Sequence, residues 1–140
     1  MNGTTFSEEQ RPIANFTLME IEITSTTNLT FLFSTNEILA NKRIVGIAVY
    51  RRNAATDVSP RGRVLVPDVD IDNGYLEFLC DNVRVVDKMP LKQIAVDANQ
   101  RQMYPVDVVG ISPTKSSITF ATAGTLATTQ SVLVGISYVD

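Results

Sequence analysis

The chain has no histidine, no tryptophan and a single cysteine, Cys80. Without histidine, a Ser-His-Asp triad, a Cys-His pair and an ordinary zinc site are excluded. One cysteine cannot form an intramolecular disulfide, so no covalent crosslink holds the fold together. Carboxylates, tyrosines and lysines remain as catalytic groups, and these absences therefore disfavour an enzyme without excluding one. We expect no catalytic activity and no cofactor.

Charge is also scarce. Charged residues make up 19% of the 140 residues, hydrophobic residues make up 44%, and the net charge is −3. This composition excludes a disordered chain and provides no overall basic field to hold a nucleic acid. No window approaches 18 apolar residues, and the N-terminus lacks the basic start and apolar stretch of a signal peptide. We expect synthesis in the cytoplasm, with no membrane and no nucleic acid as partner.

The residues that are abundant favour β-strands. Val, Ile and Thr number 42, and their short alternating runs are broken by Asn, Asp, Gly, Pro and Ser. The pattern predicts an all-β fold, an antiparallel β-sandwich of about nine strands, jelly-roll or immunoglobulin-like. We expect one domain over residues 13–140, preceded by a polar N-terminal arm, residues 1–12. The segments expected to form strands are residues 13–23, 28–34, 43–52, 63–71, 75–80, 83–86, 91–96, 106–111, 116–121 and 131–139.

A hairpin is the most specific local prediction. Asn73-Gly74 lies between alternating apolar residues, which is the pattern of a two-residue type I′ turn. Such a turn joins residues 63–71 to residues 75–80 and places Asp70 opposite Glu77. Like charges directly opposite each other are destabilising, so a cation shared by these two carboxylates is a candidate metal site. The alternative is a solvated strand face that carries the acidic residues.

Arginines flank the polar segment 53–62. A local basic cluster there predicts contact with an acidic partner surface or a nucleic acid. The alternative is ordinary strand ends with salt bridges to Asp57 or Asp68. The segment has no interleaved aromatic residues, which disfavours binding of single-stranded nucleic acid. The arginines of this basic loop are Arg51, Arg52, Arg61 and Arg63.

Residues 116–139 contain no charged residue. Alternate residues of a strand point to opposite faces, and soluble monomers usually protect exposed strands with Lys or Pro. This stretch has neither, which predicts a homo-oligomer whose subunits cover it. The alternative is a soluble sheet covered by Thr and Ser. The interface residues that we expect are Thr119, Thr122, Thr128, Val132 and Val134.

An uncharged β domain that is rich in Thr, Ala and Val resembles the small auxiliary or decoration proteins on capsids of tailed bacteriophages, including crAss-like phages. The resemblance lies in the composition and strand pattern of the whole chain. The segments that come closest to a motif are residues 90–94, 104–106 and 116–120. It carries over no functional residue. It implies a non-enzymatic virion protein, made in the host cytoplasm, that docks on the major capsid protein or other virion proteins, with a trimer favoured.

Two other functions stay open at this point. Within the virion, the alternative is a tail, baseplate or head-fibre component. From a different class, the alternative is a ligand- or glycan-binding β module, for which the chain offers Tyr50, Tyr75 and Tyr104. A glycan binder needs a site of exposed aromatic side chains, whereas a virion protein needs large, flat and weakly charged interfaces.

Overall fold

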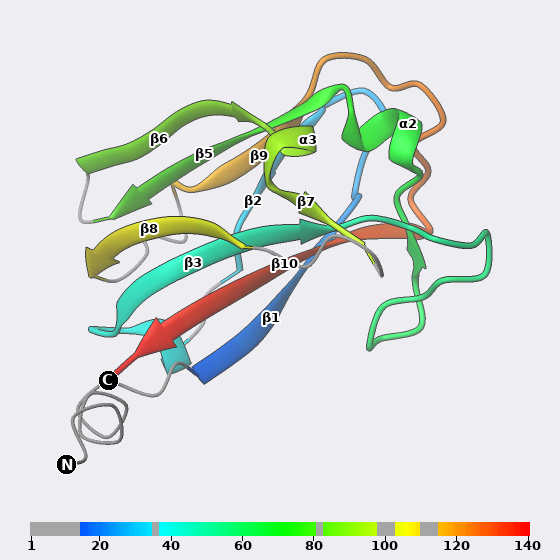
Figure 1. Ribbon diagram of the computed structural model, residues 1–140. Helices are drawn as coiled ribbons and strands as arrows, with labels where there is room; N and C mark the ends of the chain where they lie inside the picture. The colour runs from blue at the N-terminus through cyan, green and yellow to red at the C-terminus, as the bar shows by residue number, and fades with distance from the viewer. Residues whose placement is uncertain (1–14, 35–36, 81–82, 98–102, 110–114) are drawn as a thin grey trace, which may run out of the picture.

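Two β-sheets lie face to face in the computed structural model (Figure 1). The structure describes residues 15–34, 37–80, 83–97, 103–109 and 115–140. The predicted arm, residues 1–12, lies outside these residues. The all-β sandwich expected from the β-branched composition is confirmed.

The first sheet has six strands, ordered β1-β10-β3-β7, with β8 also paired to β3 and β4 to β10. The pairs β10–β4 and β3–β7 are parallel and the other pairs are antiparallel, so the sheet is mixed rather than purely antiparallel. The bounds are Asn15–Glu22 for β1, Arg43–Tyr50 for β3, Val64–Leu65 for β4, Ala95–Val96 for β7, Tyr104–Val109 for β8 and Gln130–Val139 for β10.

The second sheet has four antiparallel strands in the order β2-β9-β5-β6. A 3-10 turn, η1 (Glu37–Leu39), and two four-residue helices, α2 (Asp68–Ile71) and α3 (Leu91–Ile94), lie in the connections between strands. The strand bounds are Thr30–Leu32 for β2, Gly74–Cys80 for β5, Val83–Pro90 for β6 and Ser117–Phe120 for β9.

The core lies between the two sheets. Alternate residues of each strand point inward, as the two-residue period of a strand requires. The six-stranded sheet contributes residues such as Met19, Ile47 and Val134, and the four-stranded sheet contributes residues such as Phe78 and Phe120. One contiguous apolar cluster therefore joins both sheets.

The predicted Asn73-Gly74 hairpin is wrong. Residues 68–71 form helix α2 instead of a strand, because Pro67 holds φ at −61° and its carbonyl accepts the amides of Asp70 and Ile71 at 3.0 and 3.1 Å. The side-chain amide of Asn73 donates to the carbonyl oxygen of Val69 at 2.9 Å, so Asn73 ends the helix rather than forming a hairpin turn.

Gly74 has a different role from the one predicted. It begins β5, and it is not among the glycines with positive φ. A Cβ added there lies 2.6 Å from Leu91 Cδ1 and 3.0 Å from Phe120 Cδ1. Glycine is therefore needed at this position because two core side chains approach the backbone closely.

The expected strand over residues 91–96 is only partly correct. Pro90 precedes a helical turn, α3, and the strand β7 is limited to Ala95–Val96. The turn buries Leu91 and Ile94. In both segments a proline next to the first helical residue marks the helical turn.

Candidate functional site

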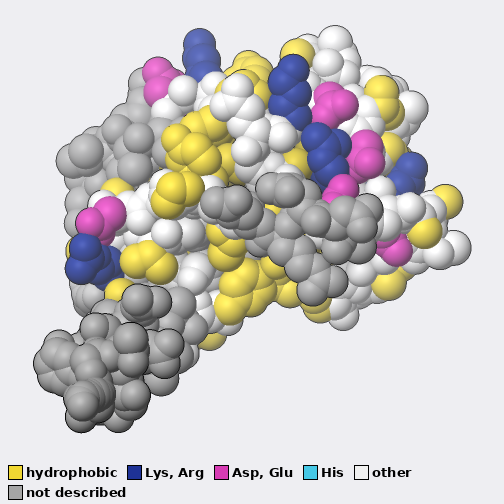
Figure 2. All heavy atoms as spheres, in the orientation of Figure 1, with side chains coloured by type: hydrophobic (Ala, Val, Ile, Leu, Met, Phe, Trp, Pro, Cys, Tyr) yellow, Lys and Arg dark blue, Asp and Glu magenta, His cyan; other side chains and the backbone are white. Residues whose placement is uncertain are grey.

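The outer face of the six-stranded sheet carries uncharged side chains along most of its three longest strands, and its acidic residues Glu20 and Glu22 lie at one end of β1. The register places Leu18 of β1 beside Gly135 of β10, and Gly135 beside Ala48 of β3. Phe16 and Leu18 remain 49% and 40% exposed. Figure 2 shows hydrophobic side chains on the face of the molecule where these strands lie. We call the side of the sheet formed by Phe16, Leu18, Ala48, Tyr50, Leu133 and Gly135 the outer apolar face. Phe16, Leu18 and Tyr50 are its exposed or half-buried part, whereas Ala48, Leu133 and Gly135 are buried.

Gly135 allows two aromatic rings to meet across the central strand. A Cβ on Gly135 lies 2.8 Å from Phe16 Cζ and 2.9 Å from Tyr50 Cε2, so a larger residue displaces at least one ring. The rings meet edge to face, with centroids 6.4 Å apart and an interplanar angle of 90°. Burial raises the pKa of the Tyr50 phenol.

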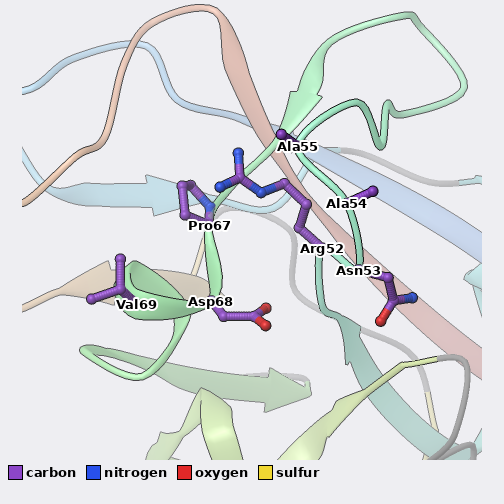
Figure 3. A pocket seen from close by; sticks show the side chains of 7 residues that line it. All are labelled: Arg52, Asn53, Ala54, Ala55, Pro67, Asp68 and Val69. Carbon is purple, nitrogen blue, oxygen red and sulfur yellow. The ribbon is translucent and has the colours of Figure 1, made fainter.

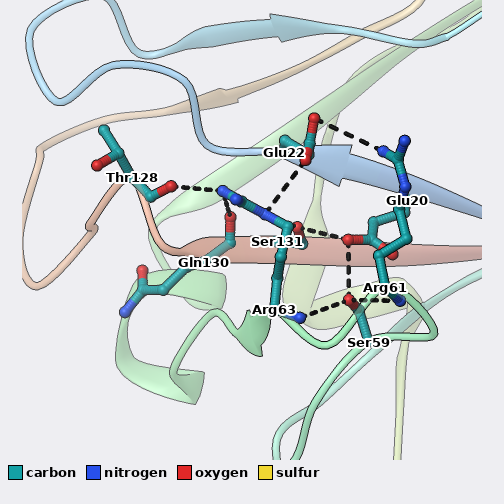
Figure 4. A network of polar contacts seen from close by, with 8 residues as sticks. All are labelled: Glu20, Glu22, Ser59, Arg61, Arg63, Thr128, Gln130 and Ser131. Atoms are coloured by element: carbon teal, nitrogen blue, oxygen red, sulfur yellow. Dashed lines mark hydrogen bonds and ion pairs between the residues drawn. The ribbon is translucent and has the colours of Figure 1, made fainter.

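A polar network borders the outer apolar face at one end (Figure 4). The hydroxyl groups of Ser59 and Ser131 donate to Glu20 Oε2 at 2.8 and 2.9 Å. Arg63 Nε donates to the Ser131 hydroxyl at 2.8 Å and lies 3.4 Å from Glu22 Oε1. The other carboxylate oxygen, Glu20 Oε1, is buried and has no hydrogen-bond partner among the described residues. The network ties the loop before β4 onto β1 and β10.

Ion pairs border the sheet at the opposite end. Arg43 makes a two-pronged contact with Asp107, at 2.6 Å from Nε to Oδ1 and 2.7 Å from Nη2 to Oδ2. This hydrogen bonding holds the pKa of Asp107 below its usual range. Lys42 Nζ lies 2.7 Å from Asp140 Oδ1. The charged side chains of the described sheet therefore stand at its ends, with uncharged residues between them.

A groove runs along one side of the sandwich, between the edge strands β1 and β2. Its volume is about 320 Å³. Ile21 and Phe31 form its apolar floor, and Glu22, Thr24 and Thr30 are among its polar walls. In the described part of the chain, β1 pairs only with β10, and β2 pairs only with β9. Within the described residues, the outward edges of both strands therefore have no strand partner beside the groove.

The four arginines of the predicted basic loop do not form one cluster. Arg51 lies 3.7 Å from Asp68 Oδ1 and 3.0 Å from Asp72 Oδ1. Arg61 and Arg63 lie against Glu22, at 3.6 and 3.4 Å. The alternative reading, ordinary strand ends with salt bridges, describes these three arginines. Asp57 instead accepts the backbone amides of Asn53 and Ala54.

Arg52 lines a second, shallow pocket of about 320 Å³ with residues 53–55 and 67–69 (Figure 3). Its guanidinium lies toward Pro67, while the carboxylate of Asp68 points away from it. One arginine in an open depression offers a contact for an anionic group but no arrangement of acid and base for a reaction.

The proposed cation pair, Asp70 and Glu77, is not assembled. Because residues 68–71 are helical, Asp70 does not oppose Glu77, which pairs with Ser117 on the neighbouring strand. Asp70 is buried, and its carboxylate accepts hydrogen bonds from the backbone amide and the hydroxyl of Thr125. Among the described residues, no three His, Cys, Asp or Glu side chains gather as metal ligands do.

Two of the five predicted interface residues lie inside the fold. Val132 and Val134 belong to the core, because β10 is the central strand between β1 and β3. Thr122 and Thr128 are exposed in the loop between β9 and β10, and Thr119 is half-buried with its hydroxyl 3.1 Å from that of Thr30. In β9 and β10, the absence of charged residues is thus explained by packing within the fold rather than by contact with another subunit.

Sequence reasoning missed the pairing of Phe16 with Tyr50 on the outer apolar face. The available signal was Gly135, a lone glycine within an apolar strand, which indicates a close approach at that point. Comparisons with protein-family models, with curated proteins and with solved structures found no match for this chain. None of the helices in the described residues is long and apolar enough to cross a membrane.

Proposed function

We propose that this protein is a non-enzymatic structural protein of a virion, an auxiliary protein that associates with itself and docks on the major capsid protein. The observation that carries the proposal is the outer apolar face, where partly exposed aromatic and aliphatic side chains lie on rigid strands. Partly exposed apolar surface with a charged rim is the usual arrangement of a protein-docking surface.

The surroundings of this face support docking rather than catalysis. The polar groups nearest to it are held by one another, with Glu22 between Arg61 and Arg63 and with Glu20 bonded to two serines. A lattice protein needs a surface of fixed shape, and strands whose charged rims are locked in place provide one. The resemblance of the sequence to phage decoration proteins leads us to propose a phage capsid as this lattice.

A glycan-binding module is the competing function from another class. Sugar rings stack on flat, exposed aromatic faces, whereas the Phe16 ring meets Tyr50 edge to face. The rings of Phe16 and Tyr50 are nonetheless the most exposed aromatic pair among the described residues. A glycan-binding assay is therefore the proper counter-test.

The test has two arms. Mass spectrometry of particles purified from the virus that encodes the chain should find the protein in the virion. Recombinant protein should bind capsids that lack it, and Tyr50→Lys should weaken that binding at least tenfold, while Val69→Lys, at an exposed valine of α2, should leave it unchanged. Absence from purified particles, equal binding by both variants, or glycan binding lost with Tyr50→Lys would overturn the proposal.

A further inference from the structure

The exposed edges of the two sheets are protected to different degrees. Natural proteins block edge pairing with Lys, Pro, bulges or very short strands. Strand β8 carries Pro105, and its pairing with β3 is interrupted by a register shift. Strand β6 carries Lys88 and Pro90 and has two register shifts, whereas β2, β4 and β7 have three residues or fewer.

In the described chain, strand β1 has neither lysine, proline, a bulge nor a short length, and its charged residues are Glu20 and Glu22. It has eight residues, no proline, no Lys or Arg, and an unbroken register with β10 from Asn15 to Glu22. A strand of this length extends for about 26 Å. Its free edge borders the groove between β1 and β2, where Leu32 is 57% exposed. An extended chain of matching length can therefore add to this edge by backbone pairing.

The charge pattern of β1 selects the orientation of the added strand. Its first half carries Phe16 and Leu18 on the outer side, and its second half carries Glu20 and Glu22 on the same side. A parallel copy would place each glutamate beside its equivalent. An antiparallel copy places the acidic half of one strand against the apolar half of the other, which avoids like charges directly opposite each other.

We propose that β1 of two copies pair antiparallel, edge to edge, about a twofold axis at Met19. This register sets Leu18 opposite Glu20 and Thr17 opposite Ile21, so that outer residues stay on the outer face and inner residues stay on the inner face. The two six-stranded sheets then form one continuous sheet, and the two outer apolar faces become neighbours. Identical strands meet through the same surface, as a closed dimer requires.

The charges of β1 are compatible with this contact. Glu22 is already paired with Arg61 and Arg63, and Glu20 is held by Ser59 and Ser131. The register also sets Phe16 of the second copy opposite Glu22, beside the exposed guanidinium of Arg61. A guanidinium near an aromatic ring is attracted to its face, which adds to the backbone pairing.

The inference rests on the self-association in the proposed function and narrows it. A twofold contact gives a dimer, in place of the trimer that the resemblance favours. It also separates two surfaces, because the edge of β1 joins copies while the outer apolar face remains available for the capsid.

Sedimentation equilibrium of the full chain at micromolar concentration tests the inference. We expect the mass of a dimer for the unaltered protein and for Val69→Lys, and the mass of a monomer for Thr17→Lys. Thr17 is half-buried on the core side of β1, and an inward-pointing lysine on an edge strand blocks pairing. A monomeric or trimeric unaltered protein, or a dimeric Thr17→Lys variant with an unchanged circular dichroism spectrum, would overturn the inference.

Hydrogen exchange gives a measurement that needs no variant. Alternate amides within residues 15–22 should exchange at least tenfold more slowly at a concentration where the dimer forms than at one where it does not. Equal exchange at both concentrations, or protection that appears only when capsids are added, would overturn the pairing of two copies. A Tyr50→Lys variant that stays dimeric but no longer binds capsids would separate the two surfaces.

Discussion

Two strands, β9 and β10, and the loop that joins them, residues 121–129, all lack charged residues. The strands and the loop are nevertheless held in the fold in different ways. The strands are covered by apolar neighbours, since each is paired on both sides and packs in the core. The loop is held by charged groups from elsewhere, namely the buried carboxylate of Asp70 and the guanidinium of Arg63. Both parts of this uncharged segment are thus held by residues from distant parts of the same chain.

The largest loss of stability is expected from a substitution in the strand β10. Val134 is completely buried in the core, so Val134→Asp places an unpaired charge there and should cost more than about 4 kcal/mol of unfolding free energy. Val69→Asp is the matched control, because Val69 is 59% exposed. Thermal unfolding followed by circular dichroism checks the pair, and equal midpoints would contradict the assignment of β10 as a central strand.

In the loop, stability should depend on the hydrogen bonds that Asp70 accepts. Asp70→Ala removes the acceptor for the Thr125 amide and hydroxyl and should cost about 1.5–3 kcal/mol, because the buried carboxylate makes two charge-assisted hydrogen bonds to the loop. Asp72→Ala, which loses an exposed ion pair with Arg51, should cost less than about 1 kcal/mol. Urea denaturation measures both changes. If the two variants are equally stable, Asp70 does not anchor the loop.

Arg63 provides the second anchor of the loop. It donates to the carbonyl oxygens of Thr128 and Gln130 and to the Ser131 hydroxyl, so Arg63→Met should cost about 1–2 kcal/mol. Arg61 is more exposed and makes one ion pair at 3.6 Å, so Arg61→Met should change stability by less than about 0.5 kcal/mol. A larger loss for Arg61→Met, again by urea denaturation, would reverse the assignment.

The smallest effect is expected at the exposed tip of the loop. Thr122→Lys should change the unfolding free energy by less than about 0.5 kcal/mol, because the side chain is exposed. Sequence analysis placed Thr122 at the subunit interface, where a lysine would dissociate the assembly. With pairing through β1, the sedimenting mass should stay unchanged. A monomeric Thr122→Lys variant would return the interface to this loop.

Most of the fold was predictable, because strand periodicity is a local property of the chain. The two interior strands of the six-stranded sheet, Arg43–Tyr50 and Gln130–Val139, both appear where their β-branched runs are dense. The two segments that follow Pro67 and Pro90 were misassigned. There, alternating apolar residues are also compatible with one helical turn, and the proline was the better guide.

The candidate site was much less predictable. Phe16 and Tyr50 meet because β1 and β3 flank β10, and this order depends on contacts between residues at least 85 positions apart. The same holds for Asp70, whose partner Thr125 lies in a distant loop. Sequence periodicity reports which face a residue occupies but not which strand lies beside it. The acidic and uncharged segments were therefore read as open surfaces.

The position of β10 also bears on the kinetics of folding. The strand β10, in the interior of the six-stranded sheet, is the last of the described strands, and it pairs with β1, the first of them. A ribosome releases residues in sequence order, so β1 and β3 leave the exit tunnel long before their shared partner exists. Pairings between such distant segments slow folding into the millisecond-to-second range for all-β domains. Until β10 is released, the apolar residues of β1 and β3 that pack against it have no partner, and exposed strands of this kind favour aggregation.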